Sequence, residues 1–211
     1  WHSSRTTLIP KSNSNRLEDH RPISVVPIGY RALASVLSRR LIHAVDLHNS
    51  QRGFIEDDGL YQAATTVRFM ASQGKPMVSI DLRKAFDSVP HATLLKACTA
   101  NGLDRKSIRL ITDIYTGATT TIQVGGQRSR AIPLCRGVRQ GDPFSPLLFN
   151  LVIDQTLRQL DRCNLGVRFG NGTLSALAYA DDIILCADNT QDLRTLTNIA
   201  ADSLSSLGLT I

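Results

Sequence analysis

The chain has 211 residues, of which 42% are hydrophobic, so it can bury one substantial core or two smaller ones. The net charge of +6 and the pI near 9.5 suit a polyanionic partner or an ordinary solvated surface. No apolar run reaches the roughly 18 residues of a membrane helix, and the four cysteines include no C-x-x-C pair. A membrane span and a zinc site are therefore disfavoured.

The N-terminal third predicts two strands followed by two helices. Residues 1–26 are extended and polar, and we expect two short strands there that carry the cations Lys11 and Arg21. These cations could hold phosphates or could simply face solvent. Apolar spacing of 3.6 residues predicts a helix over residues 27–48 and a second over about 59–72.

The middle of the chain predicts a strand, two helices and a hairpin. The strand covers residues 76–82, and a helix follows at about 91–101. Asp104 can cap the next helix. Residues 119–134 form a hairpin around two glycines.

The last third begins with a loop rich in glycine and cations, residues 136–143, which leads into a deeply buried helix with Ser145 as its N-cap. A hairpin at residues 166–178 and a final helix at about 190–207 complete the pattern. The order of elements predicts an α+β fold, with an antiparallel sheet and helices packed on one of its faces.

Three aspartates stand in unusual positions. Asp181 and Asp182 lie together between two apolar runs, and Asp81 ends another apolar strand. Two like charges in a buried hairpin are costly unless a cation neutralises them. If the strands are neighbours, the carboxylates converge and suit a pair of Mg²⁺ ions of the kind that assist phosphoryl transfer. Each signal alone has a bland interpretation, since Asp-Asp is common in turns and a strand-ending Asp is often a helix cap.

Five motifs resemble those of reverse transcriptases and occur in the same order. Tyr179-Ala180-Asp181-Asp182 resembles the Tyr-x-Asp-Asp box, and residues 81–87 look like the first catalytic box. Residues 136–150, RGVRQGDPFSPLLFN, are similar to the primer- and nucleotide-positioning box. Residues 21–24 (RPIS) and 51–54 (QRGF) match two fingers motifs.

The residues within these motifs resemble those of non-LTR (LINE-type) retrotransposons, and most closely those of the elements that insert at fixed sites in ribosomal RNA genes. Group II intron maturases are an alternative, but they usually have a proline where Arg139 stands. The resemblance implies the fingers and palm of a right-hand polymerase, with the thumb and any endonuclease outside this chain. The expected division is fingers at 1–76, the first palm strand at 77–91, fingers and palm helices with a hairpin at 92–140, and palm at 141–211.

The resemblance implies an RNA-directed DNA polymerase, a nucleotidyltransferase that adds dNTPs to a DNA primer or target DNA on an RNA template. Its cofactor would be two Mg²⁺ ions, with Mn²⁺ as a substitute, its expected location is the nucleus, and no membrane partner is expected. Because the chain has no initiator Met, we interpret it as a piece of a longer polypeptide. It could therefore be a fragment that only binds template and primer.

The resemblance also assigns roles to single residues. Asp81 and Asp181 would bind both metals and act as catalytic residues, with Asp182 assisting and the Leu82 carbonyl as a further ligand. Strand alternation likewise favours Asp181 as the stronger ligand of the adjacent pair. The residues implied to contact the incoming nucleotide are Lys11, Arg21, Lys84, Ala85, Phe86, Gln140 and Gly141.

Among these nucleotide contacts, Lys11 and Arg21 would hold the triphosphate, and Lys84 and Ala85 would offer backbone amides to it. Phe86 would be a steric gate that leaves no room for a 2′-hydroxyl. Residues 140–141 would lie over the nucleotide and the template base, where glycine permits close approach of the backbone.

Overall fold

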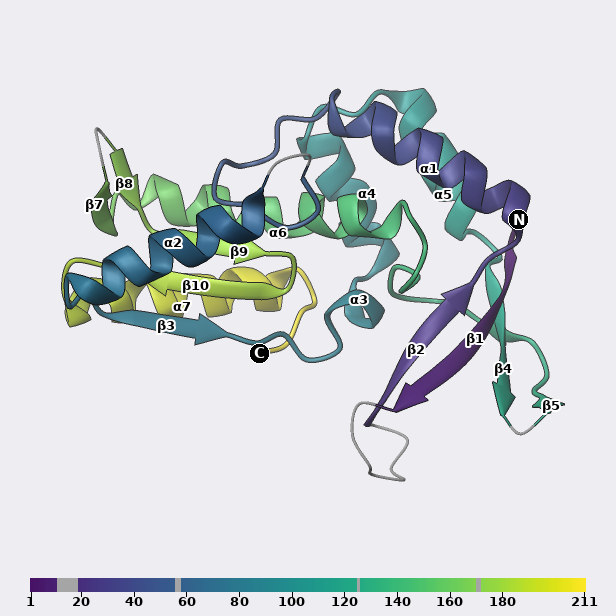
Figure 1. Cartoon of the computed structure of the whole chain (residues 1–211). Helices are drawn as coiled ribbons and strands as arrows, with labels where there is room; N and C mark the ends of the chain where they lie inside the picture. The colour runs from purple at the N-terminus through teal and green to yellow at the C-terminus, as the bar shows by residue number, and fades with distance from the viewer. Residues whose placement is uncertain (11–18, 56–57, 125, 170–171) are drawn as a thin grey trace.

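The computed structural model describes residues 1–10, 19–55, 58–124, 126–169 and 172–211. A central sheet is packed between helices, a second sheet projects to one side of the molecule, and a small hairpin lies apart from both (Figure 1). The α+β class predicted from the sequence is confirmed.

The sheet near the N-terminus is mixed. Strand β1 (Ser3–Pro10) pairs antiparallel with β2 (His20–Val25) and parallel with β4 (Thr119–Val124). Two short strands, β5 (Gln127–Arg128) and β6 (Ile132–Pro133), both pair antiparallel with β4. The β2 strand therefore forms one edge of this sheet, on the side of α3 (Figure 1).

The central sheet is antiparallel, in the order β3 (Met77–Ile80), β10 (Asp182–Cys186) and β9 (Ala176–Tyr179). Strand β3 thus lies beside β10, which comes about a hundred residues later in sequence. The convergence of Asp81 with Asp181 and Asp182 requires this pairing. A separate hairpin, β7 (Val167–Phe169) with β8 (Gly172–Leu174), precedes β9.

Helices cover both faces of the central sheet, because alternate residues of β10 point to opposite sides. Ile183 is fully buried in the main core with α6 (Ser145–Arg162) and α7 (Thr190–Ser206). Cys186 packs instead with side chains of α2 (Gly59–Ser72). In Figure 1, α2 crosses the near face and α7 lies behind the sheet. The helical layer that was predicted on one face of the sheet consists of α6 and α7. Helix α2 covers the other face, which was not predicted.

The remaining helices complete the main core. They are α1 (Ile28–Ile42), α3 (Ala85–Ser88), α4 (His91–Ala100) and α5 (Arg105–Tyr115). Helix α4 packs against both α5 and α6. As predicted, the Asp104 carboxylate caps α5 by accepting the N–H of Ser107 at 2.9 Å.

The helix predicted over residues 27–48 is shorter than expected, since α1 ends at Ile42. Beyond it, the N–H of His48 donates to the Asp154 carboxylate of α6 at 2.6 Å. The segment after α1 is therefore held by a contact with a residue more than a hundred positions away. No local sequence pattern predicts such a contact.

The prediction of Ser145 as the N-cap of α6 is wrong. Ser145 is already the first helical residue, and Phe144 occupies the N-cap position without a side-chain bond. Instead, the Asp142 carboxylate accepts the N–H of Phe144 at 3.0 Å and so satisfies a backbone donor at the start of the helix.

None of the described helices is both long and apolar enough to cross a bilayer. All four cysteines are free thiols, and Cys98 and Cys186 are buried. Helix α6 contributes more side chains to the main core than any other element, and they are buried on almost every side of its first three turns.

Candidate active site

The adjacent aspartates lie at a two-residue turn between β9 and β10. Tyr179 pairs with Asp182, so Ala180 and Asp181 form the turn itself. Ala180 has a φ of 56°, in the left-handed region that is unfavourable for residues other than glycine. This turn separates the two aspartates, since Asp181 projects from the turn while Asp182 begins the strand.

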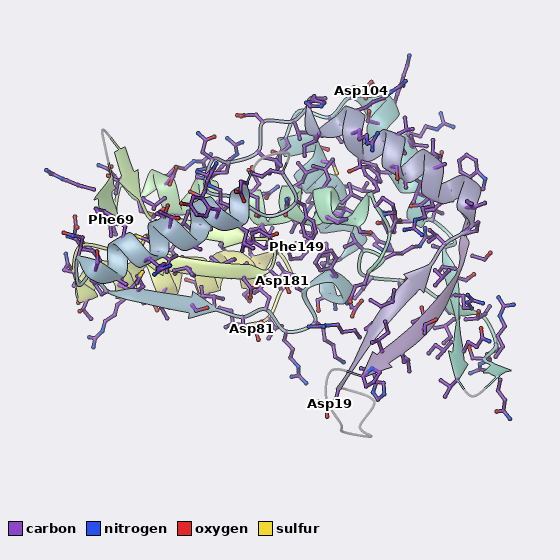
Figure 2. All side chains as sticks on the ribbon, viewed as in Figure 1. Asp19, Phe69, Asp81, Asp104, Phe149 and Asp181 are labelled. Atoms are coloured by element: carbon purple, nitrogen blue, oxygen red, sulfur yellow. The ribbon has the colours of Figure 1, made fainter. Side chains whose placement is uncertain are left out.

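The third aspartate reaches the same end of the sheet through strand pairing. Ile80 at the end of β3 pairs with Ile183 of β10, and the next residues along the two strands are Asp81 and Asp182. Figure 2 shows Asp81 and Asp181 near each other at this end of the central sheet. The convergence that the sequence argument required is present.

The charges at this point disfavour an ionised Asp181. Burial raises the pKa of its carboxyl above the usual range, and the carboxylates of Asp182 and Asp81 raise it further. The Arg21 guanidinium on β2 acts in the opposite direction. A cation placed between these carboxylates would remove the repulsion that the acidic groups exert on one another.

A cavity of about 1270 Å³ opens over the three aspartates. Most of its lining comes from four stretches of the chain that are far apart in sequence: β2, the segment after β3, the loop before α6, and the β9–β10 turn. Lys11 lies outside the described residues. Every other predicted site residue lines this cavity, namely Arg21, Asp81, Leu82, Lys84, Ala85, Phe86, Gln140, Gly141, Asp181 and Asp182.

The donors at this end of the sheet are all oxygens, which suits a hard divalent cation. Within the described ranges, no three His, Cys, Asp or Glu side chains are arranged as a complete metal cluster. Mg²⁺ is usually held by one or two carboxylates together with substrate phosphates, so the carboxylates here could hold an ion whose coordination the phosphates complete. Leu82 adds a possible backbone donor, because its side chain is buried in the core while the residue lines the cavity.

The loop before α6 is joined to β2 across the cavity. The N–H of Ser24 donates to the carbonyl of Gln140 at 2.7 Å. Gly141 has a φ of 93°, and a Cβ there would lie 3.1 Å from the Ser24 carbonyl. The Gln140 side-chain amide also donates to the Asp87 carboxylate at 3.1 Å. Residues 140–141 are thus held in place as part of the cavity lining.

The floor of the cavity includes Phe86, whose ring lies against the buried ring of Phe149. The N–H of Val138 donates to the Phe86 carbonyl at 2.7 Å, and the N–H of Gly137 donates to the Val89 carbonyl at the same distance. The loop and the short helix α3 are therefore one connected unit.

Sequence reasoning missed a buried polar cluster beneath this loop. The Tyr30 hydroxyl donates to the Asp142 carboxylate at 2.5 Å. Arg139 is 4% exposed, and its guanidinium lies 5.3 Å from the centre of the Tyr30 ring and 5.7 Å from that of Tyr115. The sequence marks Arg139 only as a departure from a proline, whereas the structure shows a cation held between two aromatic rings.

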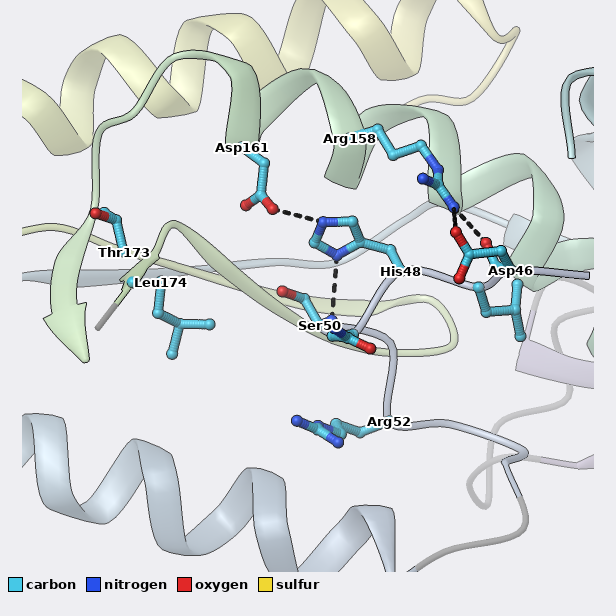
Figure 3. Close-up of a pocket in the computed structure, with 11 residues that line it drawn as sticks. Asp46, His48, Ser50, Arg52, Arg158, Asp161, Thr173 and Leu174 are labelled. Carbon is cyan, nitrogen blue, oxygen red and sulfur yellow. Dashed lines mark hydrogen bonds and ion pairs between the residues drawn. The ribbon is translucent and has the colours of Figure 1, made fainter. Parts of the chain in front are cut away.

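A second, smaller cavity of about 520 Å³ lies beside His48 (Figure 3). The His48 ring contacts the Asp161 carboxylate through Nε2 at 2.7 Å, and its Nδ1 accepts the backbone N–H of Ser50 at 3.1 Å. A histidine between an aspartate and a serine suggests a nucleophile triad. The serine contributes only its backbone here, so His48 orders the chain rather than activating a hydroxyl.

Residues 9–211 match the family model described as "Reverse transcriptase (RNA-dependent DNA polymerase)". The chain is 36% identical over 212 residues to the Retrovirus-related Pol polyprotein from type-2 retrotransposable element R2DM of Drosophila melanogaster, covering 97% of this chain and 20% of that protein. It is also 36% identical over 220 residues to the Pol polyprotein from type-1 retrotransposable element R2 of Popillia japonica, covering 100% of this chain and 31% of that protein. The chain thus spans less than a third of either relative.

Solved telomerase structures share the fold. The structure of telomerase from Candida tropicalis in complex with a TWJ fragment of telomeric RNA superposes with a TM-score of 0.67 at 15% identity, covering 99% of this chain and 39% of that one. Apo telomerase from the same organism, truncated from its C-terminal domain, gives a TM-score of 0.63 at 14% identity, covering 98% and 48%. Together with the family match over nearly the whole chain, these findings establish that the chain belongs to the reverse transcriptase family.

Proposed function

We propose that this chain is the fingers and palm portion of the RNA-directed DNA polymerase of a non-LTR retrotransposon of the site-specific, ribosomal-DNA type. It would extend a DNA primer or cleaved target DNA on an RNA template, adding dNTPs and releasing pyrophosphate, in the nucleus. The proposal goes beyond family membership, because the chain covers 20% and 31% of its two R2 relatives.

One observation carries the proposal. Ten residues that the sequence assigns to catalysis and nucleotide binding come from four distant stretches, and all of them line one cavity. Scattered surface residues with unrelated roles would not be expected to converge in this way. The division into fingers at 1–76, palm at 77–91, shared helices and hairpin at 92–140, and palm at 141–211 is part of this proposal.

The acidic end of the cavity would hold the metal ions. Asp81 and Asp181 would bind two Mg²⁺ ions, with Asp182 as the outer carboxylate and the Leu82 carbonyl as a further donor. Such an ion pair stabilises the attacking and leaving oxygens of an in-line phosphoryl displacement. The protein's own part is to hold the carboxylates of two neighbouring strands at one point, which their pairing already does.

The opposite side of the cavity would hold the nucleotide. Arg21, and Lys11 from the same end of the chain, would contact the triphosphate, and the backbone amides of residues 84–85 would assist. Residues 140–141 would cover the base, since their backbone is already held close to β2. Phe86 would lie under the sugar and exclude ribonucleotides.

Primer extension by the full protein with an RNA template, a DNA primer, dNTPs and Mg²⁺ tests the proposal, with Asp181→Asn as the variant. The amide keeps the shape of the side chain but removes the charge that holds the ions. Because a metal ion contributes several kcal/mol of charge stabilisation, we expect a loss of about 10³-fold or more. Asp202→Asn, an exposed carboxylate on α7, controls for the loss of one charge.

Salt-dependent binding of template–primer should be measured on the same proteins. Binding by both wild type and Asp181→Asn, with extension by wild type only, is the expected result. Near-normal cDNA synthesis by Asp181→Asn would contradict the assignment. Binding without extension by any of the proteins would leave this chain as a template–primer binding module instead of a polymerase.

A further inference from the structure

The segment that follows His48 runs along the outer edge of the central sheet. The N–H of Ala178 on β9 donates to the Ser50 carbonyl at 2.9 Å, and the N–H of Arg52 donates to the Ala178 carbonyl at 2.7 Å. Gln51 and Ala178 form an isolated parallel bridge. Residues 50–53 therefore act as a short fourth strand, placed next to the strand that leads into the catalytic turn.

The side chain of Gln51 contacts that turn directly. Its amide oxygen accepts the N–H of Ala180 at 3.1 Å and the N–H of Gly53 at 2.9 Å. Gln51 is only 2% exposed, so neither bond competes with bulk water. The buried side-chain oxygen of Gln51 thus connects the turn between β9 and β10 to the segment that lies beside it.

Gly53 fits closely against the same turn. A Cβ at this position would lie 2.5 Å from the Ala180 nitrogen, which is closer than real Cβ atoms approach, and 3.0 Å from the Tyr179 carbonyl carbon. The Gly53 carbonyl also accepts the side-chain amide of buried Asn150 on α6 at 2.7 Å. Residue 53 must therefore be glycine for the segment to reach the turn while it stays bonded to α6.

The segment is anchored at its other end as well. Figure 3 shows the His48 ring between Asp161 and the backbone of Ser50. The N–H of His48 donates to the Asp154 carboxylate, which Arg158 also contacts at 2.6 Å. Helix α6 thus holds residues 48–53 in place through these hydrogen bonds. The bond between Gln51 and the Ala180 N–H in turn holds the β9–β10 turn against this segment.

The turn needs such support. Ala180 holds a left-handed φ of 56°, a conformation that persists in non-glycine residues only where the surroundings enforce it. Within the described part of the chain, the Nε2 of Gln51 is buried and has no hydrogen-bond partner. A buried amide NH₂ group without a partner destabilises a fold, so the benefit of a glutamine here lies in its carbonyl oxygen.

We propose that Gln51 is a positioning residue for Asp181: it holds the Ala180 N–H and thereby sets the carboxylate of the next residue at the distance from Asp81 that a shared divalent ion requires. This inference rests on the proposed polymerase function. Its consequence is that metal affinity depends on a side chain that touches no metal, no nucleotide and no nucleic acid.

The test replaces Gln51 by methionine, which is similar in volume and unbranched but has no oxygen, in the full protein. We expect the dissociation constant for Mn²⁺, measured by electron paramagnetic resonance with the ion as the only ligand, to rise by about 10- to 100-fold, the usual effect of removing a group that orients a metal ligand. The Mg²⁺ concentration for half-maximal extension and kcat should change by similar factors, while the KM for dNTP changes by less than about threefold.

Two further variants distinguish a positioning role of Gln51 from a general effect on stability. Gly53→Ala, which forces the segment away from the turn, should reproduce the loss of Mn²⁺ affinity. Thr156→Val is the matched control, because it removes a buried 2.9 Å hydrogen bond to Ser203 between α6 and α7, away from the cavity. It should lower the melting temperature and leave Mn²⁺ binding unchanged, which separates positioning from general stability.

Amide hydrogen exchange supplies a readout that does not depend on metal binding, and its wild-type half requires no variant. The N–H of Ala180 should be protected in the wild-type protein, and in Gln51→Met its protection should fall at least tenfold while that of Ala178 falls less. An unprotected Ala180 amide in wild type, or wild-type Mn²⁺ affinity in folded Gln51→Met, would overturn the inference. If Asp181→Asn abolishes extension and both Gln51 results are negative, only this inference fails. If Asp181→Asn extends primers normally, the proposed function fails with it.

Discussion

The ring of Phe86 stacks on the ring of Phe149, with centroids 4.7 Å apart and 12° between their planes. Phe149 lies on α6 and is fully buried, whereas Phe86 is partly buried and lines the cavity. The ring that faces the cavity is therefore supported from behind by the most buried helix in the molecule. A side chain supported in this way has little freedom to move aside for a bulkier ligand.

Phe86→Val should admit ribonucleotides. Valine removes the flat ring that would meet a 2′-hydroxyl, so the preference for dNTP over rNTP, measured as the ratio of kcat/KM values, should fall by about 10- to 200-fold. Single-nucleotide extension with matched dNTP and rNTP measures it. Phe69→Val, the same substitution at an exposed residue of α2 that does not line the cavity, is the control. An unchanged ratio in Phe86→Val would remove the gate role.

Phe149→Leu should weaken the same discrimination indirectly. The substitution keeps an apolar side chain but removes the ring on which Phe86 rests, so the Phe86 ring gains freedom to tilt. We expect the dNTP-to-rNTP ratio to fall by a smaller factor than in Phe86→Val, with kcat for dNTP little changed. Loss of stability without any change in the ratio would show that Phe149 serves packing alone.

Gly137→Ala should destabilise the protein more than Gly102→Ala, although both glycines have a left-handed φ, of 86° and 80°. A Cβ at Gly137 would lie 2.8 Å from the Asp87 Cα and carbonyl oxygen, whereas a Cβ at Gly102 meets nothing within 4 Å. Gly102→Ala should cost about 1–2 kcal/mol for backbone strain alone, and Gly137→Ala more than that. Urea unfolding of both variants gives the difference, and equal costs would contradict the close contact.

Much of this fold follows from local signals. Helices α2 and α4 form close to the ranges predicted for them, and Asp104 caps the next helix as expected. The residues of the cavity follow from motifs, because chemistry restricts which side chains can stand there. A tight turn between two apolar runs was likewise sufficient to place Asp181 at a sheet end.

The features that local signals did not predict depend on partners far away in sequence. Gln51 contacts Ala180, 129 residues later, and His48 contacts Asp154, 106 residues later. Arg139 is held by rings from two different helices. Periodicity and capping rules describe neighbours along the chain, so a glutamine or histidine outside a regular element shows no local sign of such a contact. Glycine at position 53, beside that glutamine, was the only available hint of a close approach.

Asn189→Ala should lower the free energy of unfolding by about 1 kcal/mol, because the Asn189 side chain caps α7 by accepting the N–H of Asp192 at 2.9 Å. Asn198→Ala is the same substitution at an exposed position inside that helix, where alanine has the better helix propensity, and it should be neutral or slightly stabilising. Chemical denaturation of the two variants measures the contrast. Equal effects would show that the cap contributes nothing.

The carboxyl of Asp142 should make stability depend on pH. Burial raises its pKa above the usual range, although the Tyr30 hydroxyl, the Phe144 N–H and the Arg139 guanidinium favour the charged form. The folded protein therefore retains this proton to a higher pH than the unfolded chain, whose aspartates titrate near about 3.9. The free energy of unfolding should then fall as pH rises from the unfolded pKa through the folded one, and stay level above it.

Asp142→Asn tests this relationship because an amide carries no titratable proton and can still accept the N–H of Phe144. Urea unfolding between pH 4 and pH 7 should show the wild type losing stability relative to the variant as pH rises, with the difference constant at the upper end. Asp202→Asn, exposed on α7, controls for the loss of one negative charge. Parallel curves for wild type and Asp142→Asn would mean that the Arg139 cation fully compensates the cost of burying this carboxylate, and the polar cluster under the loop would then be electrostatically balanced across the whole range.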